Sequence, residues 1–159
     1  MSTRVVPPPL PTRREFCVQA CQAASMLAVG ALTGCGGSPT APSTPAAPLT
    51  SVASTLAGRV VSVQVDGASP LAAVGSAAIV QTSLGSFLLT RTGQESFVAL
   101  TATCTHEGCT VSGFASPQFV CPCHGSQFSS TGAVTKGPAS RALQQYATQL
   151  AGSVVSFTV

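Results

Sequence analysis

Residues 104–109 read Cys-Thr-His-Glu-Gly-Cys, and residues 121–126 read Cys-Pro-Cys-His-Gly-Ser. These two segments hold both histidines of the chain and four of its seven cysteines. Thiolate and imidazole are the soft and borderline donors that bind iron and zinc. Cys-x-His in the first segment and Cys-x-x-His in the second can each present one sulfur and one nitrogen from a tight loop. The spacing therefore predicts a metal centre of two cysteines and two histidines.

The sequence around these segments is typical of short strands. Val61, Val63 and Val65 alternate with polar residues, and turn residues recur about every 8–12 positions from there on. The other expected strands are 79–82, 86–92, 96–103, 111–114, 119–120, 143–150 and 153–159. No sustained helical periodicity interrupts them. We therefore predict an all-β fold of small antiparallel sheets, stacked or forming an incomplete barrel.

Composition sets limits on what this chain does. Hydrophobic residues make up 45% of the sequence, which is enough for a packed core and excludes wholesale disorder. Only 7% of residues are charged, and the formal net charge is +3. Much of that charge sits near the N-terminus, so the rest of the chain lacks the basic footprint that phosphate backbones attract. We expect no nucleic-acid partner.

Residues 1–34 predict an export signal. Arg13 and Arg14 precede a moderately apolar run at 16–32. This run is shorter and less apolar than a typical membrane-spanning helix. The arginine pair, with a phenylalanine two positions later, resembles the twin-arginine motif of proteins that are exported after folding. The domain is therefore expected outside the cytoplasmic membrane, where disulfides persist.

We expect the export signal to be followed by a lipid anchor. Residues 32–35 read Leu-Thr-Gly-Cys, which resembles a bacterial lipobox and predicts lipidation of Cys35. Residues 35–54 are rich in Gly, Ser, Pro, Thr and Ala, so we expect a flexible linker there and a folded domain over 55–159. An uncleaved signal-anchor helix and simple cleavage without a lipid are the alternatives.

The two cysteine–histidine segments, together with Gly-Pro-Ala at 137–139, resemble the Rieske [2Fe–2S] proteins over about residues 75–159. The third segment is similar to the proline loop that covers the cluster in that family. The resemblance implies a cluster-binding subdomain built from two loops, holding one [2Fe–2S] cluster. Rieske centres have two histidines in place of two cysteines on one iron.

The resemblance also implies roles for single residues. Cys104 and Cys121 would bind one iron, and His106 and His124 would bind the other. Ser126 matches the family serine that donates a hydrogen bond to a bridging sulfide.

The two cysteines that remain in these segments match a disulfide of the family's respiratory branch. Cys109 would pair with Cys123 and tie the two loops together. With Cys35 carrying the lipid, every cysteine of the mature chain then has one role. Gly108 and Gly125 would let backbone N–H groups approach the cluster sulfides, as in anion-binding nests.

Two positions depart from the respiratory pattern. Glu107 stands where quinol-oxidising members usually have an apolar residue at an exposed tip. Phe128 stands where high-potential members have a tyrosine whose hydroxyl bonds a ligand cysteine. Both departures favour a divergent electron carrier, and the carboxylate of Glu107 disfavours quinol oxidation in a complex of the cytochrome bc type.

The expected function is one-electron transfer on the periplasmic side of the bacterial cytoplasmic membrane. The partners would be the membrane, through the lipid, and a redox protein such as a cytochrome or a quinol-oxidising complex. The chain would act as a carrier or as a subunit of an oxidoreductase related to quinol:cytochrome c reductases. A small subunit of another exported redox enzyme, similar to arsenite oxidase, is one alternative. A zinc-stabilised structural lipoprotein is the other, because two cysteines and two histidines also suit Zn²⁺.

Overall fold

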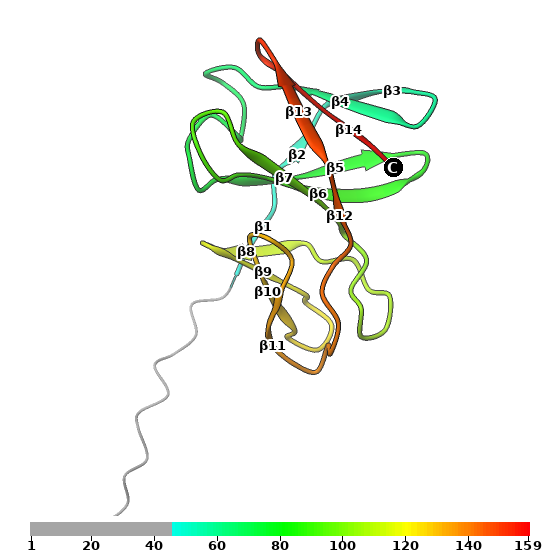
Figure 1. The fold of residues 1–159 in the computed structure, drawn as a ribbon. Coiled ribbons are helices and arrows are strands. Elements are labelled where there is room, and N and C mark those ends of the chain that lie inside the picture. Colours follow the sequence, from blue (N-terminus) through cyan, green and yellow to red (C-terminus); the bar gives the residue numbers. More distant parts are fainter. Residues whose placement is uncertain (1–45) are drawn as a thin grey trace, which may run out of the picture. The chain divides into compact units, whose positions relative to one another are not determined.

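The computed structural model describes residues 46–159, which form three open β-sheets (Figure 1). No helix occurs within this range, so the predicted all-β class is confirmed. Within the same range, no helix is long and apolar enough to cross a membrane. The predicted signal at 1–34 and the predicted lipidation site Cys35 lie outside the described residues.

The central sheet has the strand order β12-β7-β6-β5-β2. Strand β2 runs parallel to β5, and the other neighbours pair antiparallel. Its strands are Gln145–Tyr146 (β12), Phe97–Thr101 (β7), Gly85–Arg91 (β6), Ala77–Thr82 (β5) and Ser51–Val52 (β2).

Two further antiparallel sheets accompany the central one. We call them the outer sheet, with the order β13-β14-β4-β3, and the loop sheet, with the order β1-β8-β9-β10-β11. The outer sheet contains Thr148–Ala151 (β13), Val154–Thr158 (β14), Val60–Gln64 (β4) and Ser54–Ala57 (β3). The loop sheet contains Ala47–Pro48 (β1), Gly113–Ala115 (β8), Gln118–Val120 (β9), Gln127–Ser129 (β10) and Val134–Lys136 (β11).

The central sheet contributes to two hydrophobic cores because alternate side chains on a strand point to opposite faces. Phe87 and Leu89 of β6 belong to the first core, which they share with valines of the outer sheet. Leu88, between them, belongs to the second core with Ile79 and Leu100. Strands buried on both faces read as continuous apolar runs, as β6 does. The second core reaches the loop sheet and includes the cysteines of the candidate site.

The chain joins the domain earlier than the sequence predicts. Residues 47–54, placed in the expected linker, contain β1, β2 and the start of β3, which pair with three different sheets. The backbone N–H of Leu49 donates to the carbonyl of Ser112 at 2.7 Å. Leu49 packs against the second core and Val52 against the first. These two apolar residues order a segment whose composition resembles a linker.

Candidate metal centre

Two loops of equal length carry the candidate site. The first loop, 104–109, follows β7, and the second loop, 121–126, connects β9 to β10. In the first loop, the N–H of Cys104 donates to the carbonyl of Cys109 at 2.8 Å, and the N–H of Gly108 donates to the carbonyl of Cys104 at 2.9 Å. The second loop repeats both bonds at 2.9 and 3.0 Å between its corresponding residues. The two loops therefore share one backbone arrangement.

A glycine at the fifth position makes this arrangement possible. Gly108 has a φ of 75° and Gly125 a φ of 73°, and both values lie in the left-handed region that other residues avoid. A Cβ atom built at either glycine would meet no heavy atom within 4 Å. The backbone conformation, and not crowding, therefore requires glycine at these positions.

The first position of each loop is a buried cysteine. Cys104 is 3% exposed and Cys121 is 2% exposed, and both belong to the second core. Burial raises the pKa of the Cys121 thiol, and the neighbouring Cys104 thiol raises it further. The structure thus brings two buried sulfurs together, as the predicted centre requires. A metal bound there would displace their protons.

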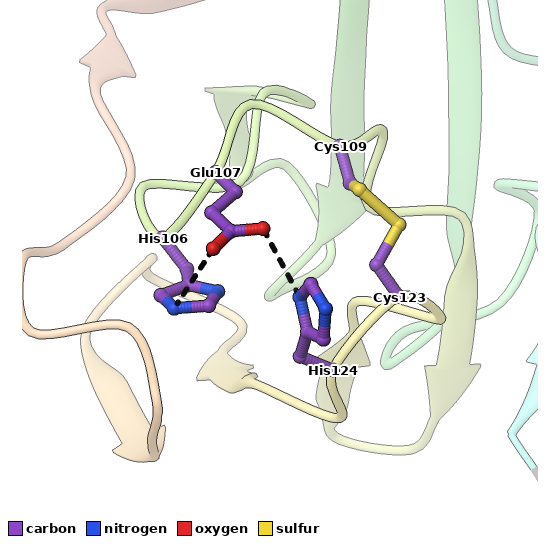
Figure 2. Close-up of a disulfide and its surroundings, with 5 residues drawn as sticks. All are labelled: His106, Glu107, Cys109, Cys123 and His124. Atoms are coloured by element: carbon purple, nitrogen blue, oxygen red, sulfur yellow. Dashed lines mark ion pairs between the residues drawn. A yellow bond between two sulfur atoms is a disulfide. The ribbon is translucent and has the colours of Figure 1, made fainter.

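The two histidines lie next to each other on the exposed side of the loops. The ring centroids of His106 and His124 are 5.0 Å apart and the ring planes are 88° apart. Their side chains are 28% and 49% exposed. The carboxylate of Glu107 lies between the rings, 3.8 Å from a nitrogen of His106 and 3.7 Å from a nitrogen of His124 (Figure 2).

A disulfide joins the loops beside the histidines (Figure 2). It connects Cys109, the sixth residue of the first loop, to Cys123, the third residue of the second, with Cα atoms 6.5 Å apart. This is the pairing that the family resemblance implied. The cysteines that remain free in the described part of the chain are Cys104 and Cys121.

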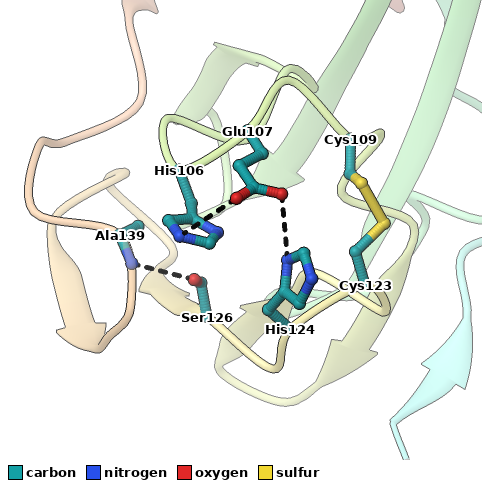
Figure 3. A network of polar contacts seen from close by, with 7 residues as sticks. All are labelled: His106, Glu107, Cys109, Cys123, His124, Ser126 and Ala139. Carbon is teal, nitrogen blue, oxygen red and sulfur yellow. Dashed lines mark hydrogen bonds and ion pairs between the residues drawn. A yellow bond between two sulfur atoms is a disulfide. The ribbon is translucent and has the colours of Figure 1, made fainter.

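Ser126 ends the second loop and is fully buried. The backbone N–H of Ala139 donates to its hydroxyl oxygen at 3.0 Å (Figure 3). Because the oxygen accepts this bond, the hydroxyl proton remains available to donate to a further acceptor. The same contact holds the predicted proline loop, 137–139, against the second loop.

Two features of the site were not predicted from the sequence. The hydroxyl of Thr105 donates to the carbonyl of Arg141 at 2.6 Å, which ties the first loop to the residues that follow the proline loop. Glu107 was singled out for its exposed position, but its contact with both rings was not foreseen. The contact with His106 could have been predicted, because Glu107 is its neighbour in the sequence. The contact with His124 could not, because it depends on how the second loop packs against the first.

Phe128 is fully buried in strand β10 and belongs to the same core as the two free cysteines. Its partner across the strands is Phe119. The position where the sequence lacks a tyrosine hydroxyl is therefore an interior one, next to the candidate ligands.

The model of the Rieske [2Fe-2S] domain family matches residues 50–147, more than half of the chain. The chain belongs to this family. A Rieske domain binds one [2Fe–2S] cluster. The family assignment therefore favours this cluster over the zinc site that the sequence left as an alternative. The cytochrome b6-f complex iron-sulfur subunit of Synechococcus sp. (strain JA-3-3Ab) is 45% identical over 60 residues, which are 37% of this chain and 35% of that protein.

A second Rieske relative is the chloroplastic cytochrome b6-f complex iron-sulfur subunit of Bigelowiella natans. It is 56% identical over 46 residues, which are 28% of this chain and 18% of that protein. The alignments therefore span about a third or less of the length of these relatives.

Two solved structures were compared with the domain. The complex of oxygenase and ferredoxin in carbazole 1,9a-dioxygenase contains a chain that matches 61% of this chain and 92% of its own, with a TM-score of 0.50 and 23% identity. That likeness shows a shared fold. The plasma membrane Rieske protein PetC3 from Synechocystis PCC 6803 matches 52% of this chain and 86% of its own, with a TM-score of 0.48 and 38% identity.

The residues present fit the cofactor of this family. Two buried thiols and two adjacent imidazoles form the mixed sulfur and nitrogen donor set of a Rieske centre. The buried hydroxyl of Ser126 has a proton to donate, which suits a buried sulfide acceptor.

Proposed function

We propose that this domain transfers single electrons through a [2Fe–2S] cluster held by Cys104, Cys121, His106 and His124. The observation that carries the proposal is the matched pair of loops, each of which carries one buried cysteine and one exposed histidine, with the two imidazoles adjacent to each other. When bound, the cluster supplies one-electron chemistry and no bond-making to a substrate. The protein contributes ligands, rigidity and a surface for exchange.

The difference in burial gives the two pairs of ligands different roles. The cysteines belong to the second core, which excludes water from their side of the site. The histidine rings are 28% and 49% exposed, so they form the edge through which a partner can exchange an electron. The Cys109–Cys123 disulfide and the contact between Ser126 and Ala139 hold that edge in place. A site held this way needs little rearrangement when its charge changes.

The redox partner is proposed to be a protein of an electron-transport chain. Support comes from the relation to iron-sulfur subunits of cytochrome b6-f complexes. Glu107 places a carboxylate between the rings, where an apolar contact with a quinol would be disfavoured. A soluble or membrane-bound cytochrome therefore fits this face better than a quinol pocket does.

The site of action is proposed to be the outer face of the cytoplasmic membrane, with Cys35 carrying a lipid. Support comes from the sequence pattern of residues 1–35 and from a disulfide beside the site, which an oxidising compartment maintains. Replacing Cys35 by Ala should release the domain from the membrane fraction of expressing cells. Undiminished membrane association of an unshortened chain would instead favour an uncleaved anchor.

Metal analysis and EPR test the proposed cofactor directly. The purified full chain should contain iron and inorganic sulfide in equal amounts and should show the EPR spectrum of a Rieske centre after reduction. Zinc without sulfide, and no EPR signal, would replace the proposal with a structural zinc site.

A further inference from the structure

Glu107 contacts both candidate histidine ligands at once. Its two carboxylate oxygens divide between the rings, one lying 3.8 Å from His106 and the other 3.7 Å from His124 (Figure 2). The side chain is 61% exposed, so it could extend into solvent, yet it lies over the rings. Among residues 46–159, the ionisable groups within 4 Å of the Glu107 carboxylate are these two imidazoles.

No nearby cation pairs with this carboxylate in the described part of the chain. Arg141 lines the same surface groove as His106 and Glu107, but it forms no ion pair with the carboxylate. The charge of Glu107 is therefore directed at the two rings and at whatever they bind. The carboxylate lies at a similar distance from a nitrogen of each ring, 3.8 and 3.7 Å, so its charge acts on both.

We propose that Glu107 is a positioning residue that acts through His106 and His124 and lowers the reduction potential of the site. The inference rests on the proposed function, because it needs a cluster bound by these histidines. Reduction adds one electron, so a fixed negative charge beside the ligands favours the oxidised form.

The size of the effect follows from the exposure of the carboxylate. An exposed charge pair is worth a fraction of a kilocalorie, which corresponds to about a twofold to fivefold change in an equilibrium. Water and salt screen such a pair, and the Debye length is about 10 Å at 0.1 M salt. The effect of Glu107 on the potential should therefore shrink as salt is added.

Glu95 provides a matched control. It is an exposed carboxylate in the turn between β6 and β7, at the opposite end of β7 from the first loop. Strand β7 alone, from Phe97 to Thr101, spans about 13 Å at roughly 3.3 Å per residue, and the first loop begins three residues beyond it. Glu95→Gln therefore makes the same change in net charge as Glu107→Gln, but beyond the screening distance.

The experiment is voltammetry on the purified, cluster-loaded wild type and on the variants Glu107→Gln, Glu107→Leu and Glu95→Gln. Both Glu107 variants should have a higher midpoint potential than wild type, by the equivalent of about a twofold to fivefold change in the one-electron equilibrium. The shift should decrease at high salt. Glu95→Gln should leave the potential unchanged.

An unchanged or lowered potential in Glu107→Gln, with the EPR spectrum intact, would overturn the inference and leave the proposed function standing. Opposite shifts in Glu107→Gln and Glu107→Leu would also overturn it, because both variants remove the same charge. A failure of the proposed function looks different, since neither wild type nor Glu95→Gln would then show a Rieske EPR signal.

Discussion

The first loop and the second loop have the same backbone hydrogen bonds and the same glycine, but they use the other positions differently. The third and fourth residues are His106 and Glu107 in the first loop, and Cys123 and His124 in the second. The histidine has moved by one position, yet the two rings still meet face to edge. A shared scaffold therefore tolerates different placements of the ligand.

The sixth residue of each loop attaches that loop to a different neighbouring segment. In the first loop Cys109 forms a covalent bond to the second loop, and in the second loop Ser126 accepts a hydrogen bond from the segment that follows. The first loop is thus held by its neighbour, and the second is held by the proline loop. Each loop depends on a contact outside itself, so their equivalence can be tested by removing one element at a time.

Loss of either histidine should have the largest effect, and the two losses should be equal. His106→Ala and His124→Ala each remove one proposed ligand, and the chain contains no other histidine to replace it. Visible absorption and iron content should fall to the background level in both variants. Thr110→Ala, at an exposed position just after the first loop, serves as the control and should keep its cluster. Full iron content in either histidine variant would contradict the ligand assignment.

Loss of the disulfide should destabilise both loops without abolishing the site. The bond closes a loop with a sequence separation of 14 residues. For about 15 residues the chain-entropy model gives about 3 kcal/mol. The double variant Cys109→Ser with Cys123→Ser should lower the free energy of unfolding by about that amount, measured by urea denaturation. Freshly prepared cold protein should still show a cluster, and its complete absence would mean that these cysteines have a role beyond bracing.

Replacement of Ser126 by Ala should affect the second loop specifically. The N–H of Ala139 would lose its buried acceptor, which costs about 1–3 kcal/mol. Urea denaturation should show that loss, and voltammetry should show a lower potential because the proposed hydrogen-bond donor to the cluster has been removed. Ser129→Ala is a comparison at a half-buried serine three residues further along the chain, at the end of β10. An equal potential shift in both variants would remove Ser126 from the site.

Replacement of the fifth residue by Ala should have the smallest effect and should be the same in both loops. Gly108→Ala and Gly125→Ala place a side chain in the left-handed region, at a cost of about 1–2 kcal/mol each. Gly67→Ala is the matched control, because that glycine also has open space around it and has no positive φ. Urea denaturation of the three variants checks the order. Unequal losses at Gly108 and Gly125 would show that the loops are less alike than their backbone suggests.

The sequence predicts the site better than it predicts the edges of the fold. The two cysteine–histidine segments and the all-β class follow from local spacing and alternation, which a single sequence displays. The parallel pairing of β2 with β5 does not, because Val52 gains its partner from a strand about 28 positions away. The ordering of residues 47–54 also escapes local analysis, since a window rich in Pro and Ala conceals the partial burial of Leu49.

The contacts of Glu107 escape prediction for a related reason. A charged residue beside a histidine is ordinary in a sequence, and its exposed position favours a solvated side chain. Only the approach of the second loop turns that residue into a bridge between two rings. Chemistry shared between distant segments is visible in a single sequence only when both segments carry a recognisable motif.

The central sheet has a consequence for how the domain loses its structure. Phe87 and Leu89 pack into one core while Leu88 packs into the other, so neighbouring residues of one strand stabilise opposite sides of the molecule. Melting either core would strip β6 of half its contacts and expose the remaining half. We therefore expect heat to unfold the domain in a single cooperative transition, with absorbance from the cluster and far-ultraviolet circular dichroism from the strands falling together. The two loops of the candidate metal centre would then unfold at the same temperature as the central sheet.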